Sequence, residues 1–372
     1  MNIEKLVSEF NNLSLSDIKE KVREIKESLP EEERKVITFS KNFTLSLSNY
    51  CQNNCSYCFY NHRIPKKGED ENIILLEKDK IEELIRRGNE YNCKEALIMS
   101  GERPESFHIV KNRLNISGYE NYIDFIENVC NITLNSYILP HINVGVLSYD
   151  EMNRLKSCSA SMGLMLESTS PRLMEKGNVH EFSPGKVPNL RITHIEEAGK
   201  LKIPFTTGLL IGIGETFYDR IKDLLLIKEL HRKYNHIQEV IIQNFAYKDR
   251  ISYKPTQEIN VRSLLKIVGL ARIIFENEIS IQIPPNLTEG FIGDFIEVGV
   301  NDLGGISPFS IDYINPEKRW PQIDYIKRKC KQIGYKLKER LPIYQKYIEN
   351  TEFVNKNVLK IIKEIYNSSK FI

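Results

Sequence analysis

The stretch NYCQNNCSYCFYNH, which runs from Asn49 to His62, contains three of the chain's seven cysteines. Cys51, Cys55 and Cys58 follow the pattern C-x3-C-x2-C, and no fourth cysteine lies nearby in the sequence. A ferredoxin-type iron–sulfur cluster takes four cysteine ligands. Three thiolates would leave one iron of a 4Fe–4S cluster without a protein ligand, so this pattern favours a cluster that also binds a small molecule.

Two other uses of these cysteines compete with the cluster. A structural zinc ion takes four ligands, usually as two separated pairs, so zinc would need His62 or a distant residue as well. A redox-active C-x-x-C pair formed by Cys55 and Cys58 would leave Cys51 without a role. The ligand count therefore favours the cluster with an open iron over both alternatives.

The composition argues for a protein without large charged surfaces. The chain has 372 residues, with 52 basic and 50 acidic side chains and a formal net charge of +2. This balance gives no basic surface for nucleic acid or for an anionic membrane. The first residues, MNIEKLVSEFNNL, are too charged for a secretory signal, and the most apolar run, Ile203 to Gly214, is too short to span a bilayer. We therefore expect a cytoplasmic protein that binds neither nucleic acid nor membranes.

The remaining cysteines show no spacing typical of a disulfide framework. We predict that they are reduced and act as small buried apolar residues. These residues are Cys93, Cys130, Cys158 and Cys330.

Short apolar runs alternate with amphipathic helical patterns from about residue 41 onward. Such runs suit parallel strands that are covered on both faces, and eight of them predict an α/β fold, a complete or partial (β/α)8 barrel of the TIM type. The predicted strands are Phe43–Ser48, Glu95–Ser100, Leu134–Ile138, Ser161–Leu166, Phe205–Ile211, Val240–Gln243, Ile279–Ile283 and Phe295–Val300. We expect a helical extension over residues 1–40, a barrel over 41–315 and a tail of helices over 316–372.

The cysteine pattern after a strand resembles that of the radical S-adenosylmethionine (SAM) enzymes, as does the aromatic Tyr57 before the third cysteine. Further motifs of that superfamily follow in the expected order. They are Ser100-Gly101-Glu102 after the second strand, Glu167 with Ser168 after the fourth, and GLLIGIGE, with Gly208, Leu210, Gly212 and Glu215, after the fifth. The resemblance implies a 4Fe–4S cluster held by Cys51, Cys55 and Cys58. It also implies that SAM lies against Tyr57, Ser100, Gly101, Glu102, Glu167, Ser168, Gly212 and Glu215.

Longer stretches resemble one family, subunit 1 of the synthases that form 7,8-didemethyl-8-hydroxy-5-deazariboflavin (FO). They are CKEALIMSGERPE (93–105), NVGVLSYDEMNRL (143–155), SMGLMLEST (161–169), KIPFTTGLLIGIGET (202–216) and HIQEVIIQNF (236–245). The sequence departs from the family at Ser56, between the second and third cysteines, and at Phe182 in VHEFSPGK, where the family has glycine. It also departs in FYNHRIPKKGED, which is less basic and more irregular.

The family resemblance implies a substrate, the adduct of a tyrosine-derived hydroxybenzyl group with a ribityl-substituted diaminouracil. It further implies a functional partnership with a second FO synthase subunit and a low-potential electron donor. Strand-end positions make Gln243, Asn244, Tyr60, His141 and Thr207 our candidates for substrate contacts. The alternatives are a related radical SAM enzyme, such as the second subunit or a menaquinone-pathway, hydrogenase-maturase or biotin synthase-like enzyme, and a non-catalytic metal-binding protein.

Overall fold

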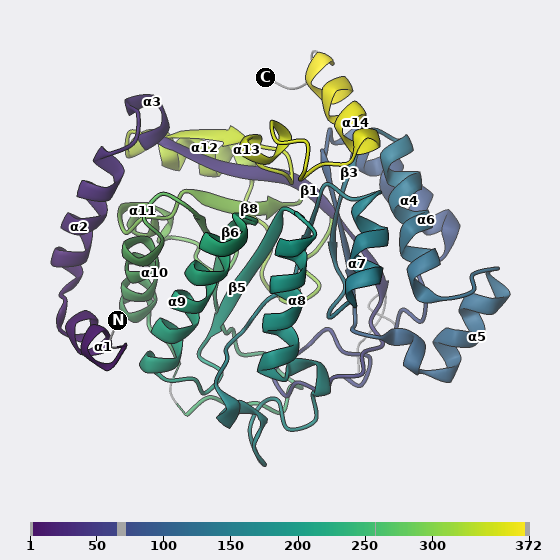
Figure 1. Cartoon of the computed structure of the whole chain (residues 1–372), viewed down its shortest axis with the longest axis horizontal. Coiled ribbons are helices and arrows are strands. Elements are labelled where there is room, and N and C mark those ends of the chain that lie inside the picture. Colours follow the sequence, from purple (N-terminus) through teal and green to yellow (C-terminus); the bar gives the residue numbers. More distant parts are fainter. Residues whose placement is uncertain (1–2, 65–71, 257, 369–372) are drawn as a thin grey trace.

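The computed structural model describes residues 3–64, 72–256 and 258–368. In this part of the chain, parallel strands β1 to β8 close into a barrel, because β1 pairs with both β2 and β8. Figure 1 shows the barrel with its surrounding helices. The strands are β1 (Val36–Ser48), β2 (Glu95–Ser100), β3 (Leu139–Asn143), β4 (Ser161–Gly163), β5 (Phe205–Ile211), β6 (Ile237–Asn244), β7 (Ser280–Gln282), β8 (Asp302–Ile306) and β9 (Lys336–Glu339). The predicted fold class is confirmed.

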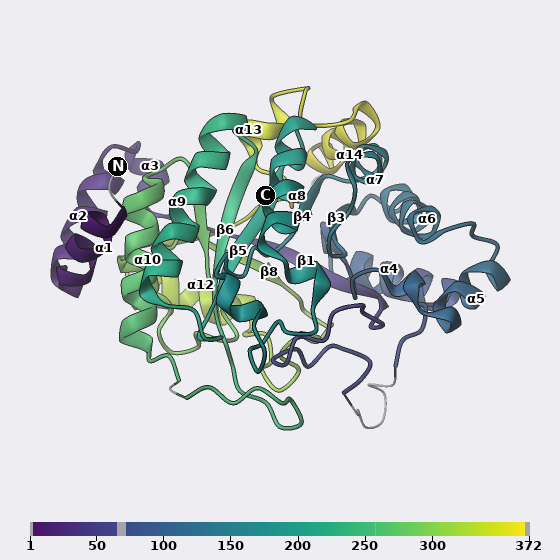
Figure 2. The same ribbon diagram turned by 60° about the horizontal axis from the view of Figure 1, so that its bottom comes forward.

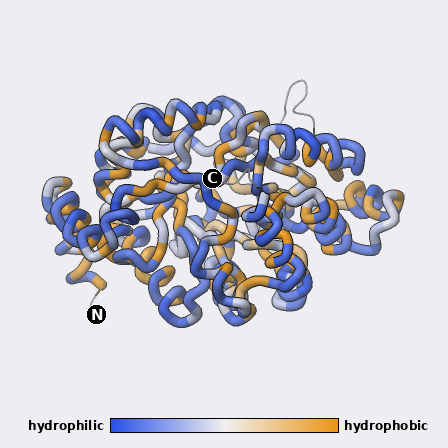
Figure 3. The backbone as a smooth tube through the Cα atoms, turned by 90° about the horizontal axis from the view of Figure 1, so that it is seen from above, coloured by the Kyte–Doolittle hydropathy of each residue, from blue (hydrophilic) through white to orange (hydrophobic). Residues whose placement is uncertain are grey.

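Helices fill the connections between the strands, as right-handed β–α–β crossovers require. The helices that precede β1 and lie between β1 and β4 are α1 (Ile3–Asn12), α2 (Leu15–Glu27), α3 (Glu31–Arg34), α4 (Lys78–Glu90), α5 (His108–Ile116), α6 (Tyr122–Asn135) and α7 (Tyr149–Lys156). The later helices are α8 (Pro188–Lys200), α9 (Phe217–Tyr234), α10 (Val261–Phe275), α11 (Ile292–Glu297), α12 (Ile323–Gln332), α13 (Gln345–Ile348) and α14 (Lys356–Asn367). In Figure 3, hydrophobic and hydrophilic residues alternate along the outer helices, as expected where one face is buried.

Two of the predicted strands were placed wrongly. The run Leu134–Ile138 ends helix α6 and turns at Tyr137, whose φ is 59°, and the third strand begins after it at Leu139. The first half of the run Phe295–Val300 forms the end of helix α11, and the eighth strand begins at Asp302. Short apolar runs do not distinguish a buried helix from a buried strand, and β8, with the sequence DLGGI, has little strand propensity of its own.

The two ends of the chain differ from the prediction of helices alone. Strand β1 begins at Val36, and its first residues pair with β9, a strand in the tail that was predicted to be helical throughout. The N-terminal helix α2 lies beside α10, and α1 contacts α9 (Figures 1 and 2). Lys266 on α10 fixes them by donating hydrogen bonds to the carbonyl groups of Asn11 and Leu13, both at 2.9 Å.

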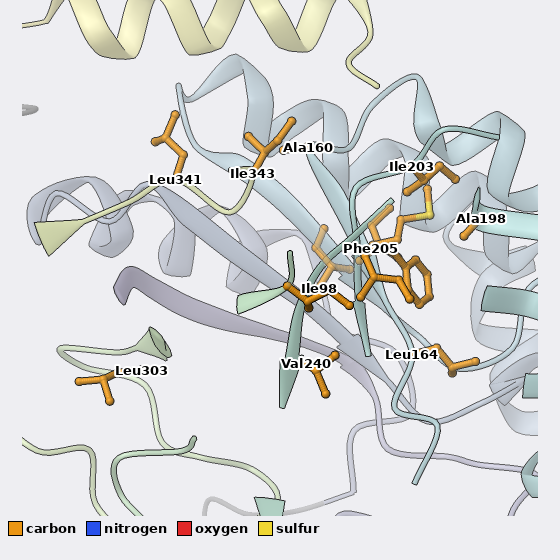
Figure 4. Close-up of a cluster of buried hydrophobic side chains, with 14 of the residues drawn as sticks. Ile98, Ala160, Leu164, Ala198, Ile203, Phe205, Val240, Leu303, Leu341 and Ile343 are labelled. Carbon is orange, nitrogen blue, oxygen red and sulfur yellow. The ribbon is translucent and has the colours of Figure 1, made fainter. Parts of the chain in front are cut away.

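The core lies between the outer surface of the barrel and its helices. Figure 4 shows side chains of the strands, such as Ile98, Phe205 and Val240, together with Ala198 of α8. Leu341 and Ile343, which follow β9, are buried in the same apolar cluster. Cys93, Cys130, Cys158 and Cys330 also belong to the buried cluster, which confirms the prediction for these four cysteines.

Arg340 closes the end of the barrel at which the strands begin. Its Nε lies 2.6 Å from Asp302 Oδ2, and its Nη2 lies 2.6 Å from Glu239 Oε2. Tyr344 Oη lies 3.1 Å from Glu239 Oε2 and 3.0 Å from Asp302 Oδ2, so its single proton is shared between the two carboxylates. The side chains of Arg340, Asp302 and Glu239 are all at least nine-tenths buried, so one cation from the end of the chain neutralises charge on two barrel strands.

We expect Arg340→Leu to lower the free energy of unfolding by about 3–5 kcal/mol, because it leaves two buried carboxylates without their cation. Urea denaturation followed by circular dichroism measures this loss. Arg86→Ala, which breaks an exposed ion pair with Glu90 on α4, is the control and should cost under about 1 kcal/mol. Equal small losses in the two variants would contradict the role assigned to Arg340.

Candidate active site

The loop that carries Cys51, Cys55 and Cys58 follows β1 at the mouth of the barrel. The Cys58 amide donates to the Cys55 carbonyl at 3.0 Å, which folds the loop back on itself. All three cysteines line one cavity of ≈ 1340 Å³. The sequence prediction that they act together is thus consistent with their placement at one site.

A second segment, Val179–Lys186, covers the cysteine loop. The amide of Asn54 donates to the Phe182 carbonyl at 2.9 Å, and that of Ser56 donates to the Val179 carbonyl at 3.0 Å. Ser183 Oγ donates to Cys55 Sγ at 3.2 Å. The side chain of Phe182 is 62% exposed, so the replacement of the family's glycine at this position needs no space inside the protein.

The three thiols and their surroundings distinguish an iron–sulfur cluster from a zinc ion. Burial raises the pKa of the Cys51 thiol to about 12, and burial together with Cys55 raises that of Cys58; a coordinated thiol gives up its proton. His62, the possible fourth zinc ligand, stacks on Tyr50 and does not line the cavity. Within the described residues, no group of three or more His, Cys, Asp and Glu is arranged to hold a single metal ion. The three thiols therefore fit a cluster with an open iron better than zinc.

The Ser100-Gly101-Glu102 turn touches the cysteine loop directly. A Cβ atom on Gly101 would lie 2.0 Å from the Tyr50 carbonyl oxygen, so only glycine fits here. The Glu102 amide donates to Cys51 Sγ at 3.2 Å. The Glu102 carboxylate accepts hydrogen bonds from Gln52 Nε2 at 2.8 Å and from the Val146 amide at 3.1 Å. Glu102 therefore joins the loops after β1, β2 and β3.

The environment of Glu102 keeps its carboxylate ionised. Burial opposes the charge, but Arg191, 3.5 Å away, and the bonds from Gln52 and Val146 outweigh that effect and lower the pKa. These partners occupy the carboxylate. In the backbone of the turn, the Gly101 amide donates to the Ser48 carbonyl at 2.7 Å and the Glu102 carbonyl accepts from the Gln52 amide at 2.9 Å. Within the described residues, the Gly101 carbonyl is therefore left to accept a hydrogen bond from a cofactor.

Glu167 ends the fourth strand region in a strained conformation. Its φ is 64°, a value that non-glycine residues rarely adopt and that often marks functional sites. The carboxylate forms an ion pair of 2.6 Å with Lys186 from the covering segment. Both side chains line the cavity that contains the cysteines, so this pair presents a fixed carboxylate near the thiols.

Three other residues predicted to bind the cofactor lie outside the lining of the cavity. Glu215 accepts bonds from the amides of Gly212 and Ile213, both at 2.8 Å, and pairs with Arg220. Ser168 lies beside Asp223, whose Oδ1 accepts a bond from the Thr169 amide at 3.0 Å. Neither Gly212, Glu215 nor Ser168 lines the cavity, so these residues shape the loops after β4 and β5.

Comparisons with known proteins agree with this geometry. Residues 45–227 match the radical SAM superfamily. The chain is 43% identical to the 7,8-didemethyl-8-hydroxy-5-deazariboflavin synthase of Methanocaldococcus jannaschii, covering 97% of both chains. It is 44% identical to the synthase of the same name from Methanothermobacter thermautotrophicus, over 89% of this chain and 98% of the relative. The chain belongs to the radical SAM family of 7,8-didemethyl-8-hydroxy-5-deazariboflavin synthases.

Solved structures show the same fold. The FeFe-hydrogenase maturase HydG superposes with a TM-score of 0.72 at 18% identity, over 96% of this chain and 76% of that chain. Methylornithine synthase superposes with a TM-score of 0.68, also at 18% identity, over 90% of this chain and 93% of that chain. As a radical SAM protein, the chain uses a 4Fe–4S cluster and SAM.

The candidate substrate residues divide into two groups. Gln243 and Tyr60 line the cavity with the cysteines, while His141 lines a second cavity that adjoins it deeper in the barrel. Asn244 and Thr207 line neither cavity. Neighbouring residues of a strand point to opposite sides of the sheet, and Thr207 Oγ1 instead accepts a bond from the Leu166 amide.

Sequence reasoning missed several polar side chains that line the upper cavity. Lys186, Arg191 and Lys248 bring positive charge to it, and Asn143 ends strand β3 there. Lys186 lies within VHEFSPGK, a stretch whose family likeness marked it for attention. Arg191 sits on α8, where a helical pattern gives no sign that its side chain reaches back to Glu102 and to the Met165 carbonyl. No described helix has the length and apolar character needed to cross a membrane.

Ser183 offers a test of how the protein tunes the cluster. Hydrogen bonds to thiolate sulfur favour the reduced, more negative cluster, so Ser183→Ala should lower its reduction potential. The loss of one net hydrogen bond of about 1 kcal/mol corresponds to about 40 mV for one electron. Redox titration of the reconstituted protein, followed by electron paramagnetic resonance, measures the shift. Ser106→Ala, on the exposed surface, is the control, and an unchanged potential in Ser183→Ala would refute the effect.

Asp223 gives a dependence of stability on pH. Burial raises its pKa to about 6, although Thr169 and Ser168 oppose the shift. The folded state thus binds the proton more tightly than the unfolded state, in which the pKa is near 3.8. Stabilisation by this proton is present below pH 3.8 and is lost by about pH 6; the shift corresponds to up to about 3 kcal/mol. Asp223→Asn should remove this dependence of the free energy of unfolding on pH. Denaturation of the variant and of the unaltered protein at pH 4 to 7 measures the difference. Parallel plots of unfolding free energy against pH for the two proteins would contradict the role of Asp223.

Proposed function

We propose that this chain catalyses the ring-closing step of FO synthesis in the pathway to coenzyme F420. Its substrate is 5-amino-5-(4-hydroxybenzyl)-6-(D-ribitylimino)-5,6-dihydrouracil, and the products are FO, ammonia, methionine and 5′-deoxyadenosine. The identity to an FO synthase and the placement of the cysteines support this assignment. The chain shares 43% identity with an FO synthase along 97% of both chains, and its three cysteines line one barrel cavity.

The residues of the site divide the work. Cys51, Cys55 and Cys58 hold the cluster. When bound, the cluster and SAM supply the one-electron chemistry that removes a hydrogen atom from the substrate. We assign the cofactor's polar contacts to the backbone of the Ser100–Glu102 turn and to Glu167. A ribose hydroxyl can donate to this carboxylate, which Lys186 holds in place at 2.6 Å. The walls of the barrel exclude water from the reacting groups.

Gln243 and Tyr60 face the same cavity as the thiols and are our candidates for orienting the reacting part of the substrate. The hydroxyl of Tyr60 bonds to Ser46 Oγ and to the Ser48 carbonyl, both at 2.8 Å, which fixes the ring. The side-chain amide of Gln243 makes no hydrogen bond within the described residues, so it remains available to a ligand.

The reaction requires two partners. A second FO synthase subunit makes the adduct from tyrosine and 5-amino-6-(D-ribitylamino)uracil, and a low-potential donor in the cytoplasm supplies the electron. The fold alone also suits other radical SAM enzymes, including one that uses tyrosine directly. HydG and methylornithine synthase share that fold at only 18% identity, so their likeness gives no information about the substrate of this chain.

The test uses anaerobically reconstituted protein with SAM, a reductant and the synthetic adduct. We expect the fluorescence of FO to appear together with 5′-deoxyadenosine. Cys55→Ala should abolish both products, because the cluster loses one of three ligands, whereas Cys330→Ala, which alters a buried cysteine far from this loop in the sequence, should retain them. Full activity of Cys55→Ala would falsify the catalytic role of the loop. Consumption of free tyrosine in place of the adduct would assign the chain to the second-subunit reaction.

A further inference from the structure

The deeper part of the barrel lumen carries polar side chains on most of its strands. The interior of a TIM-type barrel is usually filled by layers of branched apolar residues. Here a cavity lies in its place. Its inward-facing polar residues are Asn42, Glu95, His141, Thr206, Glu239 and Gln282, which we call the polar layer. This cavity shares Leu97, Met99, Asn143, Ile241 and Gln243 with the cavity of the cysteines, so the two adjoin each other.

Two consecutive glycines of β8 make space for the polar layer. A Cβ atom on Gly304 would lie 1.9 Å from Gln282 Nε2, and one on Gly305 would lie 2.0 Å from Asn42 Nδ2. Any larger residue at these positions of β8 would displace the two amides. The side chains of β8 are therefore kept small where those of β1 and β7 enter the lumen.

Two members of the polar layer have hydrogen-bonding capacity that the protein does not use. Gln282 is only 9% exposed, and its amide makes no hydrogen bond within the described residues. His141 Nδ1 lies 2.7 Å from Ser161 Oγ, whose proton goes to the Pro342 carbonyl. Nδ1 must then be the donor, so the neutral ring presents Nε2 as an acceptor. Buried polar groups are almost always paired, and these two face the lumen instead.

Charge in the polar layer disfavours an anionic ligand. Arg340 is saturated by Asp302 and Glu239, and Glu95 adds a further carboxylate that accepts only a weak bond of 3.4 Å from Asn42 Nδ2. The floor is closed by Arg340 and Pro342. A ligand for this recess must carry no negative charge, must be able both to donate and to accept hydrogen bonds, and must be narrow enough to enter from the upper cavity.

We infer that the polar layer is the binding site for the ribityl chain of the substrate, a neutral polyol. Each hydroxyl of such a chain donates one hydrogen bond and accepts others, so it can donate to Glu95 and to His141 Nε2 and accept from the amides of Asn42 and Gln282. The upper cavity, with its thiols and with Leu97, Met99 and Leu210, is then left to the cofactor and the ring system. This inference rests on the proposed function, because that function supplies a substrate with a polyol arm.

Truncation of the ligand tests the inference on the unaltered protein. Affinity is measured by isothermal titration calorimetry with the SAM-loaded, oxidised holoenzyme, for the adduct and for an analogue whose ribityl chain is replaced by ethyl. We expect the analogue to bind at least about tenfold more weakly, because several hydrogen bonds are lost. Equal affinities would overturn the inference, and so would an analogue that binds more tightly.

A paired variant tests which residues receive the chain. Gln282→Leu should weaken binding of the adduct about fivefold, from the loss of a hydrogen-bonding side chain, and leave the affinity of the ethyl analogue unchanged. Gln332→Leu, on the exposed surface, is the control and should change neither. An equal loss for both ligands would show that Gln282 does not contact the polyol. If the variant is unfolded by circular dichroism, the ligand comparison on the unaltered protein still decides.

The same experiment separates the inference from the proposed function. FO fluorescence from the adduct with the unaltered enzyme establishes the function whichever way the affinities fall. An adduct analogue without the phenolic hydroxyl tests whether the aromatic arm, and not the ribityl chain, occupies the recess. For this analogue too, the ratio of its affinity to that of the adduct is compared between Gln282→Leu and the unaltered protein. If the variant changes this ratio, and not the ratio for the ethyl analogue, the aromatic arm occupies the recess and the inference fails.

Discussion

The three thiols depend on hydrogen bonds that come from outside their own loop. A loop of this length cannot fix three side chains by its own contacts, because it forms no regular secondary structure. Here β2 supplies the amide that reaches Cys51, and the segment after β4 supplies the hydroxyl that reaches Cys55. That segment also takes up two backbone amides of the loop. Correct placement of the cysteines thus requires that the barrel is already assembled around them.

Glu102 links these parts of the site electrostatically. It joins the turn after β2 to Arg191 on α8, while its backbone amide reaches a thiol. The glycines beside it leave room for the carboxylate: a Cβ atom on Gly185 would lie 1.4 Å from Glu102 Oε1. Glu102 therefore acts on the site mainly by holding together the loops after β1, β2 and β3 and helix α8. Its conformation is set by charged and small residues that lie far away in the sequence.

The sequence predicted the class of fold and the cysteine site because both have local signals. C-x3-C-x2-C is a contiguous pattern, and long apolar runs such as Phe205–Ile211 form strands where expected. The strands β8 and β9 could not be predicted in the same way, because Asp302–Ile306 and Lys336–Glu339 are polar or glycine-rich and become strands by pairing with β1. Within the site, Ser183 stands in the stretch VHEFSPGK, which resembles the family, but nothing local indicated its bond to Cys55, and Arg191 had no local signal, because both roles come from tertiary contacts.

Strand β9 and the arginine after it have a consequence for biosynthesis. The barrel begins with Val36, yet its first strand needs Lys336–Glu339 as a neighbour, and the carboxylates of Glu239 and Asp302 need Arg340. Pairings between such distant residues slow folding. A growing polypeptide on the ribosome can make strands β1 to β8 early, but it lacks the counter-charge for its interior until Arg340 has also been synthesised. Chaperones have their longest opportunity to act on this protein in that interval.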